Sequence, residues 1–289
     1  MMARLTVRPG PLASLLALLC LSMFLGACSE TQSPLATHSD EESARPAPSR
    51  DPLRILFIGN SNFAFNDLPA LFGGLAADRG RDVEIEALVP FGWSLEDHFN
   101  SLTTRDMITS RDWDVVVLQG SGQAVGYPTT VPFNPVSNLI LFSQLIHGHC
   151  STTEIMFSMP WAHEDGMLWY PLPHDYFVMY QRIYDNTLAY PEIVDLVIAP
   201  VGSAWHAVML EEPPLHYLFA DDWYHPSPRG SYLTACTIYA SVFRETAVGA
   251  GFLGGLPENE ARRFQIVASG TVLEDLELWH LASPVTSVD

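Results

Sequence analysis

Leu53–Asn62 reads LRILFIGNSN, and the interpretation of the whole chain depends on this stretch. Its first part, 53–58, is an almost unbroken apolar run, which is typical of a strand buried on both faces of a parallel sheet. The run ends in the turn GNSN at 59–62, and a helical pattern begins at Asp67. Open α/β sheets place their chemistry at the carboxyl ends of strands, which makes Ser61 a candidate nucleophile. A strand-to-helix turn with an ordinary cap explains the same residues equally well.

The rest of the chain alternates between strand-like and helix-like patterns. Apolar or alternating runs predict strands at 53–58, 83–89, 113–119, 154–159 and 193–199. Helical spacing predicts helices at 67–79, 94–102, 136–147, 175–190, 231–244 and 258–268, with a short one from 201 and flexible loops at 120–123 and 161–174. This alternation predicts a parallel, doubly wound α/β domain. No dinucleotide fingerprint or phosphate-binding loop follows the first strand, which disfavours nucleotide binding.

The N-terminal residues predict export. Arg4 and Arg8 precede an apolar segment at 12–25, which is too short to span a bilayer comfortably and suits a signal sequence. The segment closes on LGAC, which resembles a bacterial lipobox with Cys28 as the lipidated mature N-terminus. We expect a signal peptide at 1–28, a disordered linker at 29–52 and a lipid-anchored protein of the cell envelope. Ser29 after the cysteine favours the outer membrane or a periplasm-facing site, and a plain secretory signal is the alternative.

Composition and charge narrow the class of protein. Of the 289 residues 48% are hydrophobic and 16% charged, which describes a well-filled globular core. The formal charge of −19 argues against nucleic acid and against attraction to anionic lipid headgroups. Cys150 and Cys236 are the cysteines of the predicted folded part. Two independent buried cysteines are favoured over a disulfide, which stays open.

A second informative stretch is DWYH at 222–225. An aspartate three residues before a histidine can hold the imidazole in one tautomer and stabilise the imidazolium that forms during proton transfer. A serine hydroxyl needs such a base because it is hardly ionised at neutral pH. Asp222 and His225 are therefore candidate partners of Ser61, with Asp221 as a rival for Asp222. A solvated polar loop is the alternative interpretation of so short a pattern.

Four blocks together resemble the SGNH (GDSL-like) hydrolase superfamily, in its branch with GNS in place of GDS. The blocks are IGNSN at 58–62, FGWSLEDH at 91–98, VLQGSGQ at 117–123 and DWYHPSPRGSYL at 222–233. Each falls at the carboxyl end of a predicted strand or in its following loop, and the resemblance covers essentially the whole folded part from 53 to about 273. It implies a flavodoxin-like three-layer α/β/α sandwich with a five-stranded parallel sheet, in a hydrolase domain at 53–289 that includes a C-terminal helical tail.

The resemblance also implies the roles of individual residues. Ser61 is the expected nucleophile, His225 the base and Asp222 its orienting partner. The oxyanion of this family is bound by two backbone N–H groups, here those of Ser61 and Gly92, and by a side-chain amide. The usual asparagine after Gly120 is absent, so Gln119 is the first choice for that amide and Gln123 the second. An ordinary strand-end role for Gln119 stays open.

These features lead to an expected function. We expect a serine hydrolase that cleaves carboxylic esters and removes acetyl groups from glycans, with a general esterase or lipase-like activity as a close alternative. Aromatic residues near the predicted site, with packing as an equal alternative to sugar stacking, are Trp93, Trp161, Trp169, Tyr170 and Trp223. No cofactor or metal is expected, because the histidine-rich stretches 147–150 and 163–165 lack ligand spacing. Expected partners are an ester substrate and, through Cys28, the membrane. The missing asparagine motivates an alternative, a non-catalytic envelope lipoprotein that binds carbohydrate.

Overall fold

The structure is a computed structural model that describes residues 46–167, 175–214 and 216–282. The predicted signal peptide, Cys28 and the first part of the predicted linker lie outside the described residues, as do Trp169 and Tyr170. Within the described ranges, no helix combines the length and the apolar character that crossing a bilayer requires. Cys150 and Cys236 are both free thiols, so they do not form the disulfide that the sequence left open.

One parallel sheet organises the described part, with strands in the order β2-β1-β3-β4-β5. The strands are β1 (Leu53–Ile58), β2 (Val83–Leu88), β3 (Val115–Gln119), β4 (Glu154–Ser158) and β5 (Val197–Ala199). The register places Ile58 opposite Leu118, so the turn after β1 lies beside Gln119 at the end of β3. The predicted doubly wound α/β sheet is confirmed.

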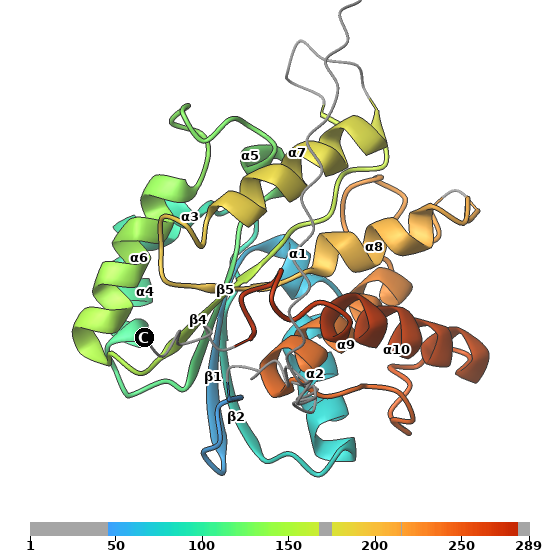
Figure 1. The fold of residues 1–289 in the computed structure, drawn as a ribbon, viewed down its shortest axis with the longest axis horizontal. Coiled ribbons are helices and arrows are strands. Elements are labelled where there is room, and N and C mark those ends of the chain that lie inside the picture. Colours follow the sequence, from blue (N-terminus) through green and yellow to red (C-terminus); the bar gives the residue numbers. More distant parts are fainter. Residues whose placement is uncertain (1–45, 168–174, 215, 283–289) are drawn as a thin grey trace, which may run out of the picture. The chain divides into compact units, whose positions relative to one another are not determined.

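Helices cover both faces of the sheet. They are α1 (Ser61–Ala64), the 3-10 turn η1 (Phe65–Asp67), α2 (Leu68–Asp78), α3 (Leu95–Asn100), α4 (Leu102–Ile108), α5 (Gly122–Val125), α6 (Val136–His149), α7 (Tyr176–Ala189), α8 (Val201–Met209), α9 (Pro228–Phe243) and α10 (Glu258–Leu273). Figure 1 shows α3, α4 and α6 on one side of the sheet and α2, α9 and α10 on the other. This arrangement makes the three-layer sandwich.

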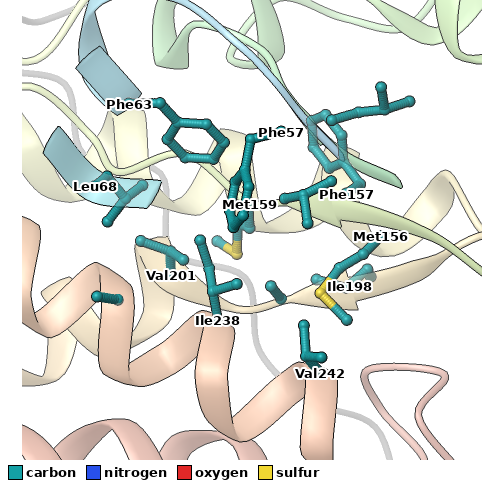
Figure 2. Packing of buried hydrophobic residues seen from close by; sticks show 14 of the residues in the cluster. Phe57, Phe63, Leu68, Met156, Phe157, Met159, Ile198, Val201, Ile238 and Val242 are labelled. Atoms are coloured by element: carbon teal, nitrogen blue, oxygen red, sulfur yellow. The ribbon is translucent and has the colours of Figure 1, made fainter. Parts of the chain in front are cut away.

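The core between the sheet and α9 explains why this helix has so few charged residues. Every α9 residue from Gly230 to Phe243 is buried. Figure 2 shows Phe57 and Ile198, from β1 and β5, above Ile238 and Val242 of α9. The other face of α9 packs against α10, α8 and α2, so the helix has no face left for water. The burial of this much apolar surface is the main favourable contribution to folding.

The structure differs from the prediction in local elements. The helix expected at 94–102 ends at Asn100 as α3, because Ser101 adopts an extended conformation and caps a further helix, α4, which was not predicted. The predicted flexible loop at 120–123 contains the short helix α5, because the Ser121 side chain accepts the N–H of Ala124 and caps it. The strand expected at 193–199 is limited to β5, and Ile193 is exposed.

Candidate active site

The nucleophile turn is held by the side chain of Asn60. Ser61 is the first residue of α1, and the Asn60 side chain caps that helix by accepting the N–H of Asn62 at 3.1 Å. The Asn60 amide nitrogen donates to the carbonyl of Trp93 at 3.0 Å. Asn60 therefore ties the turn after β1 to the loop after β2, and Ser61 is 6% exposed at their junction.

Gln119 and His98 support this turn from behind. Gln119 Oε1 accepts the backbone N–H of Asn60 at 3.0 Å, and its Nε2 donates to the carbonyl of Gly120 at 2.5 Å. A Cβ atom at Gly59 would lie 2.7 Å from Gln119 Oε1, so this close approach requires glycine. His98 Nε2 lies 2.7 Å from the carbonyl of Gly59, and Nδ1 lies 3.2 Å from Thr104 Oγ1. Burial lowers the pKa of His98 although the Gly59 hydrogen bond opposes the shift, which favours a neutral ring that donates from Nε2.

The structure brings Ser61, His225 and Asp222 into one hydrogen-bonded chain, although Ser61 and His225 are separated by 164 positions. His225 Nε2 lies 2.8 Å from Ser61 Oγ, and His225 Nδ1 lies 2.6 Å from Asp222 Oδ2. A proton on Nδ1 donates to the carboxylate, which leaves Nε2 as an acceptor for the serine hydroxyl. The geometry selects Asp222 over Asp221 as the partner of His225.

Asp222 is held in its ionised form. Burial disfavours its charge, but hydrogen bonds from the His225 ring and from the backbone N–H groups of His225 and Tyr224 lower its pKa overall. The two N–H groups lie 2.9 Å and 3.1 Å from Asp222 Oδ1. One carboxylate oxygen thus shapes the loop and the other orients the imidazole.

Phe65 and Asn66 fix the base against the nucleophile. The Phe65 ring stacks on the His225 ring with centroids 4.1 Å apart and planes within 3°. The Asn66 side-chain nitrogen donates to the carbonyl of Pro226 at 2.9 Å and to Ser231 Oγ at 2.9 Å. Asn66 reaches both from a left-handed backbone conformation with φ of 56°. We call Phe65 and Asn66 the clasp, because together they join η1 to the loop that carries His225.

The two glutamines predicted as oxyanion donors have different environments. Both ends of the Gln119 amide are bonded to the backbone behind the nucleophile turn, where its role is to position Asn60. Gln123 lies on α5, and its Nε2 is buried without a hydrogen-bond partner in the described part of the chain. Gly92 has φ of +77° and open space around its Cα. Gln123 is therefore the one of the two whose amide nitrogen has no partner among the described residues, whereas Gln119 is bonded at both ends.

His163 is a buried neighbour of the base. It is 6% exposed, and its ring makes an edge contact with Tyr224, with centroids 4.4 Å apart. Burial, and then the nearby charge of His225, lower the pKa of His163 from 6.5 to about 4. The ring is consequently neutral at physiological pH. Beside it, the Glu164 carboxylate accepts the ring and backbone nitrogens of His216.

Several residues that build the site were missed in the sequence. Ser61, Asp222 and His225 were found because their residue types carry the chemistry. The supporting residues Phe65 and Asn66 act through contacts across the fold and were not predicted, whereas His98 belongs to the block at 91–98 but its role could not be assigned from that pattern. The one available signal was Asn66-Asp67, a pair of residues that tolerate left-handed backbone better than most.

No protein-family model matches the chain, and no curated protein matches it significantly. Solved structures do match. A DUF4886 family protein from Bacteroides uniformis aligns with a TM-score of 0.64 at 17% identity, over 76% of this chain and 95% of that one. A GDSL-like lipase from Parabacteroides merdae gives 0.50 at 18%, over 69% and 99%. A lipase/acylhydrolase from Enterococcus faecalis gives 0.50 at 16%, over 66% and 96%. The similarity establishes the architecture: the chain has the fold of the SGNH (GDSL-like) hydrolases.

Proposed function

We propose that this protein is a serine hydrolase that cleaves carboxylic esters through an acyl-enzyme. The observation that supports this most directly is the hydrogen-bonded chain from Asp222 through His225 to Ser61 Oγ. A base within 2.8 Å of the hydroxyl, itself oriented by a carboxylate, is the arrangement that activates a serine.

The reaction follows from this geometry. Ser61 Oγ attacks the ester carbonyl carbon while His225 Nε2 takes the serine proton. The bond from that carbon to the alcohol oxygen then breaks, and His225 passes the proton to the departing alcohol. Water, activated by the same nitrogen, cleaves the acyl-serine bond and regenerates the enzyme. Ionised Asp222 stabilises the imidazolium that exists between these transfers.

The oxyanion is assigned to three donors. The backbone N–H groups of Ser61 and Gly92 are the first two, and the free Nε2 of Gln123 is the third. An unpartnered buried donor costs about 1–3 kcal/mol, so a developing negative charge beside it would gain a hydrogen bond that the resting site lacks. The absent asparagine therefore does not by itself favour the non-catalytic alternative.

The departing alcohol belongs on the His225 side, because that alcohol must receive its proton from Nε2. Two exposed aromatic rings lie there. Phe91 is 67% exposed and stacks on Phe65, and Trp223 is 42% exposed two residues before His225. Aromatic faces of this kind stack on sugar rings, which supports a glycan as the alcohol part of the ester and fits the expected glycan substrate.

We further propose that the protein is lipid-anchored in the cell envelope through Cys28, as the lipobox-like sequence LGAC suggests. Metabolic labelling with an alkynyl fatty acid should tag the protein, and Cys28→Ser should abolish the label. A Cys28→Ser variant that is labelled as strongly as the parent would refute the anchor.

The catalytic proposal is tested with the purified full-length chain in detergent micelles. It should hydrolyse p-nitrophenyl acetate, and a fluorophosphonate probe should attach covalently to Ser61. Ser61→Ala should abolish both signals. Persistent hydrolysis in Ser61→Ala would refute the mechanism, and failure to cleave any ester or to react with the probe would favour the carbohydrate-binding alternative.

A further inference from the structure

A cavity of about 320 Å³ is lined in part by Gly120 and Ser94, which follow Gln119 and Trp93 of the candidate active site in the chain. The lining residues used below are Leu95, Glu96, Gln123, Tyr127, Phe133 and Asn138. They come from the start of α3, from α5 and its following loop, and from the first turns of α6. The volume falls within the range of small-molecule sites, which begins at about 300 Å³.

Hydrogen bonds connect two walls of this cavity to the nucleophile turn. Gly120 lines the cavity, and its carbonyl accepts the Gln119 amide that also binds the N–H of Asn60. Ser94 lines the opposite wall and follows Trp93, whose carbonyl accepts the Asn60 side chain. The cavity is therefore built onto the residue that precedes Ser61.

The layers of the fold decide which part of an ester the cavity can receive. His225 lies three residues before the start of α9, whereas the cavity belongs to α3 and α6, and these helices cover opposite faces of the sheet (Figure 1). The alcohol must lie beside His225, which returns its proton. The remaining substituent of the carbonyl carbon, the acyl group, points to the opposite side. We infer that the cavity is the acyl pocket and that it receives a neutral acyl group of several carbons, larger than acetyl.

The lining supports this class of ligand. Leu95, Tyr127 and Phe133 supply apolar and aromatic surface, while the described residues that line the cavity include the carboxylate of Glu96 and no Lys, Arg or His. An anionic acyl group would meet a negative charge without a balancing cation, so it is disfavoured. A single methyl group would leave most of the volume to water, since one water occupies about 30 Å³.

Gln123 links this pocket to catalysis. It lines the cavity, and its buried Nε2 has no partner in the described part of the chain. In the inferred pose, an ester whose acyl group enters the cavity has its carbonyl oxygen toward the Gln123 side chain. The same amide can therefore bind the oxyanion and line the entrance to the pocket. This inference rests on the proposed hydrolase function.

The inference is tested with p-nitrophenyl esters that share one alcohol and differ only in the acyl chain. With the full-length protein in micelles, kcat/KM should rise at least tenfold from acetate to hexanoate. The upper limit is roughly fourfold per added methylene, the factor that corresponds to about 0.8 kcal/mol per buried CH₂. A flat or falling series would overturn the acyl pocket while leaving the hydrolase function intact if Ser61→Ala is inactive. No turnover of any ester would refute both proposals.

A pair of adjacent variants on α6 locates the effect. Asn138 lines the cavity, whereas Ser137 is exposed and does not. Asn138→Phe should lower the hexanoate-to-acetate ratio of kcat/KM at least fivefold, and Ser137→Phe should leave the ratio unchanged. If Asn138→Phe does not fold, Ala124→Leu fills the same cavity from α5. An unchanged ratio in the filled variant, or an equal fall in Ser137→Phe, would overturn the inference.

Discussion

The side chain of Asn66 joins the two stretches of chain that carry the nucleophile and its base. It donates to the Pro226 carbonyl and to Ser231 Oγ, both at 2.9 Å, and so holds the residue next to His225. Its backbone has φ of 56°, which glycine adopts freely and alanine does not. Asn66→Gly therefore removes the two hydrogen bonds without straining the backbone, whereas Asn66→Ala removes them and adds strain.

The magnitudes follow from these contacts. Two hydrogen bonds at about 0.5–1.5 kcal/mol each give a loss of roughly 1–3 kcal/mol of stability in Asn66→Gly. Strain at a left-handed residue adds about 1–2 kcal/mol in Asn66→Ala. A change of 1 kcal/mol moves the melting temperature by roughly 2–4 °C in a domain of this size. We expect Asn66→Gly to melt several degrees below the parent, with Asn66→Ala lower still.

The effect on catalysis should exceed the effect on stability. A misplacement of about 1 Å in a catalytic group costs on the order of 10²-fold in rate, so a loosened His225 loop should lower kcat/KM 10- to 100-fold. The assay is hydrolysis of p-nitrophenyl acetate at 20 °C, far below either melting transition. Asp67→Asn is the matched control, since Asp67 also has a positive φ and its side chain accepts the N–H of Ala70 in its own helix.

The refuting result is specific. If Asn66→Gly melts several degrees lower yet keeps kcat/KM within twofold of the parent, the clasp contributes only stability. In that case Asp222, the stacked Phe65 ring and the neighbouring backbone suffice to place His225 without the two Asn66 hydrogen bonds.

Three further outcomes are expected. Gln123→Ala should lower kcat about 10²- to 10³-fold with little change in melting temperature, because it removes an oxyanion donor; a loss below threefold would refute that assignment. Gln119→Ala should instead lower the melting temperature, since it leaves the Asn60 N–H without its buried acceptor, as measured by thermal denaturation. The parent should lose about 2 kcal/mol of stability between pH 7.5 and 5.0 through His163, whose pKa falls from 6.5 unfolded to about 4 folded. The sign follows because the unfolded state binds this proton first as the pH falls. In His163→Phe, denaturant titrations at both pH values should show a correspondingly smaller loss, and an unchanged loss would contradict the buried, neutral ring.

Strands β1 to β4 were predicted to within two residues at either end, and the half-buried edge strand β2 was predicted as well as the fully buried strands. In β3 every residue is buried, and all but the last, Gln119, are apolar, which is the near-continuous run expected of a strand covered on both faces. The predicted strand at 193–199 was too long because Ile193, although apolar, is 52% exposed and lies outside the sheet. The helix starts capped by Ser101 and Ser121 were missed because the apolar spacing around them does not show where a serine caps a helix. Tertiary contacts determine whether the cap forms.

The residues of the candidate site also divide into those that residue type predicts and those that only the fold distinguishes. Ser61, His225 and Asp222 could be predicted because each carries a group that few other residue types supply. The choice between Gln119 and Gln123 could not, because both carry the same amide and differ only in what the fold places beside it. The register of β1 against β3 places the Asn60 N–H beside the Gln119 side-chain oxygen. The resulting hydrogen bond holds the Gln119 side chain behind the nucleophile turn.

The position of the substrate follows from the sheet itself. Because β1 is an inner strand, Ser61 lies at an edge that both helical layers can reach, and each layer supplies a different part of the site. In the proposed reaction, the α9 side supplies His225 and its clasp, which act on the alcohol oxygen of the ester. The α3 and α6 side supplies the cavity at Gln123, which contacts only the acyl group. Changes in the α6 side chains can therefore alter acyl preference without moving the base. This separation is what the Asn138 and Asn66 variants distinguish: the first should change the ratio between esters, and the second should lower the rates of all of them together.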